Sequence, residues 1–310
     1  MAVILISGGS GLVGTNLTRH LLERNHEAII LTREKNKVSD HPKISYTFWD
    51  TKKGILDADV VKKADHIIHL AGAGVMDKKW TEAYKKEIVD SRTVSTALIV
   101  KALQENENKI KTFVSASAIG YYGEDGNPLV RKEGFIETDL PSAGFLGETC
   151  VRWEASSEPV KSMGIRLVKL RTGIVLANEG GALKEYKLPL KFGFATIFGN
   201  GKQAVSWIHI DDLCRMYCDA FEHDYFSGVY NATAPEIVSQ KKLVTTLGEK
   251  LKNKFFTPIH IPMFALKLFL GQRSIEILKS ATVSSKKVKT EGFTFLYPTL
   301  DAALEDLSKK

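Results

Sequence analysis

The residues with the clearest chemical meaning are glycines near the start of this 310-residue chain. Their spacing reads as Gly9-x-Gly11-x-x-Gly14 or Gly8-x-x-Gly11-x-x-Gly14, between an apolar run and a helical pattern. That context is typical of a loop that grips a dinucleotide pyrophosphate. Glycine permits the tight turn, keeps Cβ atoms away from the phosphates and opens a helix whose first N–H groups face the anion. We therefore assign cofactor binding to five residues, Gly8, Gly11, Leu12, Val13 and Gly14.

The residues after the second apolar run indicate which dinucleotide is bound. The run 28–31 ends in Thr32-Arg33-Glu34, about 20 residues past the glycines, where an acid selects the ribose of NAD and an arginine accommodates the 2′-phosphate of NADP. Arg33 and Glu34 compete for this position. We favour Arg33, because it comes first and Thr32 adds a hydroxyl donor. The prediction is NADP(H), with Glu34 pointing away from the phosphate.

Strand-like and helix-like patterns alternate along the first half of the chain, which predicts a parallel sheet with helices on both faces. Apolar, β-branched runs lie at 3–7, 28–32, 44–48, 66–70, 111–115 and 165–170, and helical patterns at 12–24, 57–63, 81–104 and 145–163. A Gly-, Pro- and acid-rich stretch, 122–143, reads as a long loop over the carboxyl edge of the sheet.

These patterns predict an α/β fold, a Rossmann-type doubly wound parallel sheet with a smaller, mostly helical C-terminal substrate lobe. Residues 1–175 would form the NADP-binding domain, with elements near 205–232 returning to it. Residues 176–310 would form the substrate lobe, in which short helices should dominate.

Composition narrows the partners. The net charge is +7, but the lysines are scattered, and no basic patch with interleaved aromatics suggests nucleic-acid binding. The most apolar late segment, 264–270, is too short to span a membrane. Three cysteines without metal-type spacing suit a reducing compartment and predict no metal site. We expect a cytoplasmic monomer or homodimer that binds a small-molecule substrate.

Several longer segments then resemble one family. They are 66–74, 79–81, 88–92, 115–123, 170–176, 206–212, 230–235 and 292–298. Together they resemble the extended short-chain dehydrogenase/reductases, which include the nucleotide-sugar epimerases and dehydratases, and in particular the atypical YfcH-like "epimerase family" proteins. The resemblance covers essentially the whole chain. We expect further cofactor contacts from Leu70, Ala71, Gly72, Arg92, Ser115, Arg171 and Gly173, and substrate contacts from Trp80, Gln203 and Trp207.

One departure from the family matters for chemistry. Short-chain reductases carry Tyr-x-x-x-Lys on a helix that corresponds here to 145–154, where the tyrosine exchanges the substrate proton and the lysine lowers its pKa. This chain has Leu146 and Cys150 in those positions, or Phe145 and Thr149 if the register shifts by one. No plausible register restores the pair.

Other residues could supply the missing polar groups. Ser117 matches the serine that orients the substrate oxygen, and Tyr121 and Tyr122 follow it, either as proton donors or as walls of the pocket. Arg92 stands where many relatives carry an asparagine. It could bind an anionic substrate or the cofactor, or it could be an ordinary charge on a helix face. In the second lobe, Asp211 and Asp212 look like caps for a helix that starts near Leu213.

The sequence therefore leads to one main hypothesis and two alternatives. The main one is an NADP(H)-dependent oxidoreductase or epimerase-like enzyme that acts on an unknown small polar substrate. The first alternative is a redox-silent NADP(H)-binding sensor or assembly protein. The second is a nucleotide-sugar epimerase.

Overall fold

The computed structural model of the chain describes residues 1–125, 134–252 and 255–309. Its centre is an eight-stranded sheet of order β12-β7-β6-β5-β1-β2-β3-β4. Neighbouring strands run parallel, except that β4 is antiparallel to β3. The strands are β1 (Val3–Ser7), β2 (Glu27–Thr32), β3 (Ile44–Asp50), β4 (Ile55–Leu56), β5 (His66–His69), β6 (Thr112–Ala118), β7 (Arg166–Thr172) and β12 (Gly228–Ala232). The six predicted strands are all present.

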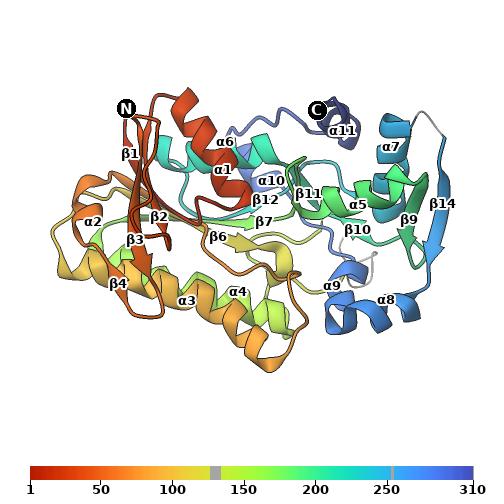
Figure 1. Ribbon diagram of the computed structural model, residues 1–310, viewed down its shortest axis with the longest axis horizontal. Coiled ribbons are helices and arrows are strands. Elements are labelled where there is room, and N and C mark those ends of the chain that lie inside the picture. The colour runs from red at the N-terminus through yellow and green to blue at the C-terminus, as the bar shows by residue number, and fades with distance from the viewer. Residues whose placement is uncertain (126–133, 253–254, 310) are drawn as a thin grey trace.

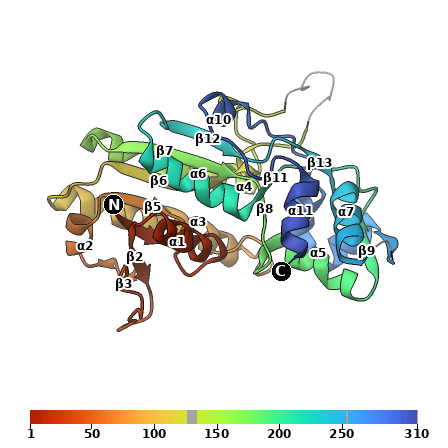
Figure 2. The ribbon, with the colours of Figure 1, turned by 90° about the horizontal axis from the view of Figure 1, so that it is seen from above.

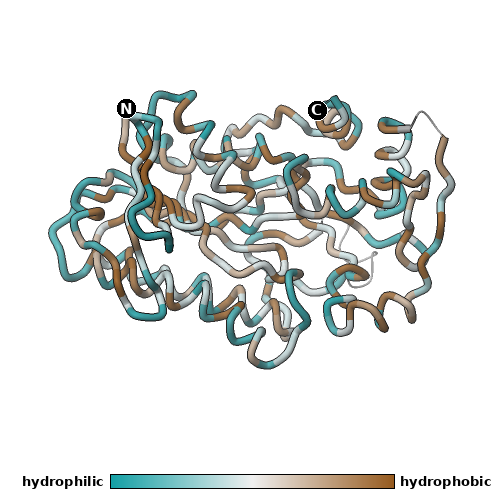
Figure 3. Tube along the Cα trace, in the orientation of Figure 1, coloured by the Kyte–Doolittle hydropathy of each residue, from teal (hydrophilic) through white to brown (hydrophobic). Residues whose placement is uncertain are grey.

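Helices cover both faces of this sheet (Figures 1 and 2). On one face lie α1 (Leu12–Glu23) and α6 (Ile210–Glu222), and on the other lie α2 (Asp59–Lys63), α3 (Glu82–Glu105) and α4 (Phe145–Ser156). Alternate residues of β1 explain the layers, because Ile4 and Ile6 pack into the core under α1 and α6 while Leu5 packs into the opposite core. The central strands are correspondingly apolar in Figure 3. The doubly wound fold class is confirmed.

The second lobe contains strands as well as helices. It holds three two-stranded sheets, β8 with β11, β9 with β14 and β10 with β13. Short helices do predominate in the described part of this lobe, as expected, and the short strands add to them. Its elements are β8 (Ile174–Leu176), α5 (Gly181–Lys191), β9 (Phe194–Phe198), β10 (Ala204–Val205), β11 (Trp207–His209), β13 (Val238–Ser239), α7 (Gln240–Lys252), β14 (Thr257–Ile261), α8 (Met263–Leu270), η3 (Gly271–Arg273), α9 (Ser274–Leu278), α10 (Lys286–Thr290) and α11 (Leu300–Ser308).

Two elements return from the second half of the chain to the main sheet. The strand β12 pairs in parallel with β7 at the edge of the sheet, and α6 packs beside α1. Both were expected within 205–232, whereas the division of the chain near residue 175 stays a prediction. None of the helices in the described ranges is long and apolar enough to cross a membrane.

Some element ends differ from the sequence prediction. The expected helix 145–163 is two elements, α4 and the 3-10 helix η2 (Glu158–Met163), with Pro159 at the start of the second. Residues 126–133 of the predicted loop 122–143 lie outside the described residues. The shorter turn after α1 is as expected, because Asn25 adopts a left-handed conformation with φ of 64°.

The expectation that Asp211 and Asp212 cap α6 was wrong. The helix begins at Ile210, and its N-cap is His209, whose ring accepts a hydrogen bond from the backbone N–H of Asp211. Asp212 is fully buried and instead accepts hydrogen bonds from the backbone of the C-terminal segment at Leu296 and Tyr297. This carboxylate therefore fastens the segment around Leu296 and Tyr297 to α6.

Candidate cofactor site and reaction site

The glycine loop between β1 and α1 is packed too closely for side chains. Gly8 has φ of 73°, and the N–H of Gly11 donates to its carbonyl oxygen over 3.1 Å. A Cβ atom on Gly14 would lie 2.3 Å from that same oxygen, and one on Gly8 would lie 2.9 Å from the backbone nitrogen of Ala71. Such a turn at a helix N-terminus leaves backbone N–H groups free to bind phosphate. Leu12 and Val13 form the first turn of α1 and are half-buried.

A buried polar network supports this loop from below. The ring of His69, at the end of β5, lies 2.5 Å from Ser7 Oγ through Nδ1 and 3.0 Å from Thr96 Oγ1 through Nε2. Ser7 Oγ also accepts from the backbone N–H of Ala71. Burial lowers the pKa of His69 to about 4, so its ring is neutral at pH 7. Sequence reasoning missed this network, although a histidine at the end of an otherwise apolar strand signals a buried hydrogen-bond partner.

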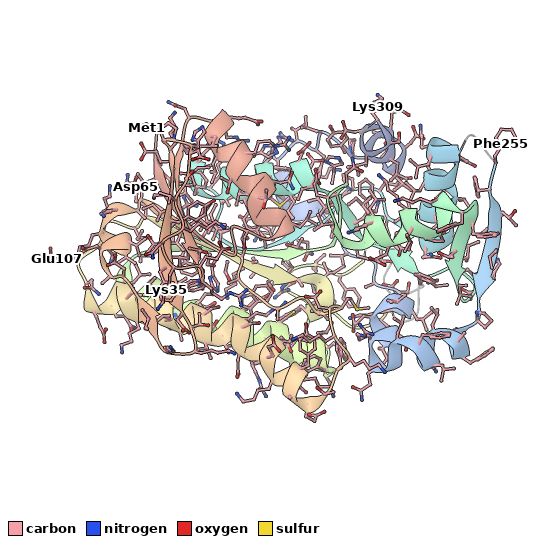
Figure 4. The ribbon with its side chains drawn as sticks, in the orientation of Figure 1. Met1, Lys35, Asp65, Glu107, Phe255 and Lys309 are labelled. Carbon is pink, nitrogen blue, oxygen red and sulfur yellow. The ribbon has the colours of Figure 1, made fainter. Side chains whose placement is uncertain are left out.

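Arg33 lies exposed just after β2 and makes no ion pair among the described residues. Its competitor Glu34 is paired with Lys37 over 3.1 Å. The hydroxyl oxygen of Thr32 accepts from the backbone N–H of Glu34, which leaves its proton available to a ligand. In Figure 4, Lys35 marks this loop, at the opposite end of the strands from Met1 and Asp65, which precede β1 and β5. A positive charge thus stands free beside the glycine loop.

The loop after β5 is held between α3 and α4. One guanidinium nitrogen of Arg92 donates to the carbonyl oxygens of Ala73 (3.1 Å) and Ile88 (2.8 Å), and the guanidinium carbon lies 4.9 Å from the centre of the Trp153 ring. Trp80 donates its indole N–H to Val75 and packs edge-on against the Phe145 ring. Leu70 and Ala71 are half-buried and Gly72 is exposed, as a cofactor contact requires, so their assignments and that of Trp80 stay predictions.

The predicted catalytic serine and one predicted tyrosine belong to a buried ion-pair network. Arg171 Nε and Nη2 bind the two oxygens of Glu154 at 2.8 and 2.9 Å, and Ser117 donates to the same carboxylate over 2.7 Å. Arg171 also donates to the hydroxyl oxygen of Tyr122, which in turn donates to Asn231. Burial would lower the pKa of Arg171, but its bonds to Glu154 raise it above its ordinary value. Glu154, the partner at the centre of this network, was not among the predicted site residues.

This network engages three of the predicted site residues, whose roles toward a ligand stay predictions. Ser117, Tyr122 and Arg171 do come together, but their polar groups satisfy one another, and their exposed fractions are 2%, 0% and 3%. Burial also raises the pKa of Tyr122 to about 12, so the phenol holds its proton. Side chains in this state hydrogen-bond one another and position the ends of the strands.

Three further predicted site residues are buried, and their assignments also stay predictions. Ser115 is fully buried and donates to the carbonyl oxygen of Ala116. Trp207 is fully buried in the hydrophobic core of the second lobe, and Gln203 is nearly buried and donates to the carbonyl oxygen of Phe198. Gly173, in contrast, is half-buried, and a Cβ there would meet the backbone of Ser206 at 2.6 Å, so its cofactor role stays a prediction.

In the first of the two registers, the positions that the family fills with tyrosine and lysine hold inert groups. Leu146 and Cys150 both lie beside Gly120, where a Cβ would stand 3.4 Å from Leu146 Cβ and 3.8 Å from Cys150 Sγ. Burial raises the pKa of Cys150 to about 12, and its thiol donates to the carbonyl oxygen of Ala118. Of the predicted catalytic residues, Tyr121 alone keeps a half-buried side chain whose hydroxyl has no partner among the described residues.

A parallel sheet with a glycine turn after β1 and the crossover helix α3 after β5 defines the nucleotide-binding class of short-chain dehydrogenase/reductase folds. The sequence matches the NAD dependent epimerase/dehydratase family over residues 4–143 and a domain of unknown function, DUF1731, over 261–307.

Full-length comparisons identify the family more closely. An epimerase family protein of Staphylococcus saprophyticus is 37% identical over 306 residues, which cover 98% of each chain. The crystal structure of human epimerase family protein SDR39U1 with NADPH matches with a TM-score of 0.84 at 27% identity over 99% of each chain. UDP-glucuronic acid 4-epimerase of Bacillus cereus, solved with UDP-glucuronic acid and NAD, shares the fold at 20% identity, with a TM-score of 0.78 over 99% of each chain. The protein belongs to the epimerase family of atypical extended short-chain dehydrogenase/reductases.

Proposed function

We propose that the protein is an NADP(H)-dependent oxidoreductase or epimerase-like enzyme that acts on a small polar substrate. The observation that carries the choice of cofactor is the exposed guanidinium of Arg33 directly after β2, which has no ion-pair partner among the described residues and lies next to an acid that Lys37 already binds. An arginine at this place accommodates the 2′-phosphate of NADP. The neighbouring lysines add a positive field that attracts the same dianion. The human relative solved with NADPH agrees with this choice.

Each part of the cofactor has candidate binding residues in the chain. The backbone of Gly8 to Gly14 would hold the pyrophosphate at the start of α1, and Arg33 and Thr32 would hold the 2′-phosphate. Residues 70–72 would face the ribose. NADP(H) supplies or accepts the hydride when bound. Tyr121 is the remaining candidate to exchange a proton with the substrate, because its hydroxyl is not already engaged.

A direct test compares the two nicotinamide cofactors. Fluorescence titration of the wild type should show tighter binding of NADPH than of NADH. Arg33→Gln should weaken NADPH binding about 10- to 100-fold, because charge-assisted hydrogen bonds contribute about 1.5–3 kcal/mol, and should change NADH binding little. Arg152→Gln, which removes an exposed arginine of α4, is the matched control. Tighter binding of NADH by the wild type would contradict the assignment.

The reaction site supports a second candidate, a redox-silent NADP(H)-binding sensor or assembly protein. The observation that favours it is the pairing of inert Leu146 and Cys150 in the positions of the family's proton-transfer groups. NADPH oxidation against a panel of carbonyl compounds separates the two candidates. Turnover supports the enzyme, whereas tight NADPH binding without turnover on any carbonyl supports the sensor.

A further inference from the structure

Arg92 is a buried cation without a carboxylate partner among the described residues. Its exposed fraction is 9%, and one terminal nitrogen, Nη1, makes both of its short hydrogen bonds, to Ala73 and Ile88. The nitrogens Nε and Nη2 have no acceptor in the described part of the chain. Arginine carries five N–H donors and cannot lose its charge in a protein. The edge of this guanidinium formed by Nε and Nη2, called the free edge below, is therefore able to donate hydrogen bonds to a bound acceptor.

A second buried arginine of the same fold, Arg171, differs from Arg92 in its hydrogen-bond partners. Arg171 is similarly buried, but its Nε and Nη2 bind the two oxygens of Glu154, and its Nη1 donates to the hydroxyl oxygen of Tyr122 and the carbonyl oxygen of Glu137. The pKa of Arg171 is raised, whereas burial lowers the pKa of Arg92. A buried charge is costly unless a counter-charge or hydrogen bonds compensate it. Only Arg171 has that compensation from the chain itself.

The surroundings of Arg92 offer donors rather than acids. The Trp153 ring covers one face of the guanidinium, and its own indole N–H is buried without an acceptor in the described parts of the chain. The ionisable neighbours Cys150 and Tyr84 are uncharged at neutral pH, because burial raises the pKa of both. This corner between α3 and α4 is therefore positive, with unfilled hydrogen-bond donors.

The corner adjoins the expected path of the cofactor. The guanidinium carbon of Arg92 lies 3.0 Å from where a Cβ atom on Gly72 would stand, so Arg92 occupies the space beside a residue predicted to contact the cofactor. A ligand that runs past Gly72 would lie close to the guanidinium of Arg92, whose Nε–Nη2 edge has no acceptor among the described residues. A bidentate oxyanion matches that edge in both charge and shape.

We propose that Arg92 is the receptor for an oxyanion, a carboxylate or phosphate group, at this end of the cofactor site. The proposal rests on the proposed function, because it makes the substrate of the same site a small anionic molecule. The alternative source of the same chemistry is a phosphate of the cofactor itself, and the experiment distinguishes the two.

The experiment measures two quantities for the wild type and for Arg92→Gln. The first is the rise in Tm caused by sodium phosphate, oxalate or acetate over sodium chloride at equal ionic strength, without and with saturating NADPH. The second is the affinity for NADPH. A rise in Tm that persists with NADPH and is lost in Arg92→Gln assigns the oxyanion to the substrate. A loss of NADPH affinity of about tenfold or more in the variant assigns it to the cofactor.

Variants with matched chemistry make the result decisive. Arg152→Gln removes a charge of the same sign one residue from Trp153 and should change neither quantity. Arg92→Lys keeps the charge but loses the planar fork, so the effect that Arg92→Gln abolishes should weaken at least about threefold; it also replaces Arg92→Gln if that variant does not fold. If both quantities match the wild type in the Arg92 variants, the proposal is overturned. Failure of the wild type to bind NADPH would contradict the proposed function instead, and would leave the anion measurement readable.

Discussion

Two regions at the carboxyl edge of one sheet solve opposite problems. Around β1 and β2, the turn consists largely of glycines, which carry no side chains. The arginine after β2 pairs with no acid among the described residues. Around β6 and β7 the chain does the reverse, because Arg171, Glu154, Ser117 and Tyr122 saturate one another's polar groups. The first region is built to bind something from outside, and the second is closed on itself. The proposed cofactor loop and the buried polar network therefore belong to separate parts of this chain.

The largest expected effect comes from breaking the buried ion pair between Arg171 and Glu154 in the second, closed region. Glu154→Gln leaves the Arg171 guanidinium buried without its counter-ion, and breaking a buried pair in this way costs about 3–5 kcal/mol. Urea unfolding should show that loss, while NADPH affinity of the folded variant stays within about threefold of the wild type. Glu82→Gln, which breaks a surface pair with Lys85, should cost less than about 1 kcal/mol. A large loss of cofactor affinity in Glu154→Gln would show that the two regions are not separate.

The next largest effect comes from adding a side chain to the glycine loop of the first region. In Gly14→Ala the new methyl group would stand 2.3 Å from the Gly8 oxygen and 2.5 Å from Gly9 Cα, so the loop must move. We expect NADPH affinity to fall at least about 100-fold, which corresponds to about 2.7 kcal/mol. Gly144→Ala is the control, because its nearest neighbour would be Ser142 Oγ at 3.5 Å. Circular dichroism should confirm that both variants fold, and unchanged NADPH binding by Gly14→Ala would contradict the assignment of the loop.

The same two regions show what the sequence could reveal. The glycine loop and Arg33 were predictable because each is a short, local pattern attached to one strand, and strand periodicity locates it. The pairing of Arg171 with Glu154 was not, because β7 and α4 must first take their places in the fold. Their contact then depends on how α4 is rotated on the sheet, which a single sequence does not specify.

The burial of Trp207 escaped prediction for a similar reason. Trp207 begins a short strand, β11, that the sequence patterns did not predict, and the family resemblance suggested a substrate contact. Its neighbours in the core of the second lobe come from distant segments, including Leu183, Leu243 and Leu304. Such long-range packing decides whether an aromatic side chain lines a pocket or fills a core.

Tyr121 and Tyr122 bring the comparison down to two adjacent phenols. The guanidinium of Arg171 lies 3.4 Å from the centre of the Tyr121 ring, and Tyr121→Phe keeps that contact while removing a hydroxyl that has no partner among the described residues. Its effect on unfolding free energy should stay within about 0.5 kcal/mol. Tyr122→Phe removes hydrogen bonds to Arg171 and Asn231 and should cost about 1–3 kcal/mol.

If the protein is an enzyme, Tyr121→Phe should lower the turnover rate more than Tyr122→Phe, which is the reverse of their expected effects on stability. A positioned proton donor contributes about 10²- to 10⁴-fold, so Tyr121→Phe should lower kcat by that factor with NADPH affinity unchanged. Tyr122→Phe should leave kcat near the wild-type value at temperatures where the variant is folded, because the phenol of Tyr122 is buried and its hydroxyl already binds Arg171 and Asn231. If Tyr121→Phe leaves turnover intact, Tyr121 is a wall of the pocket, and the proton must come from a group that the closed region does not contain.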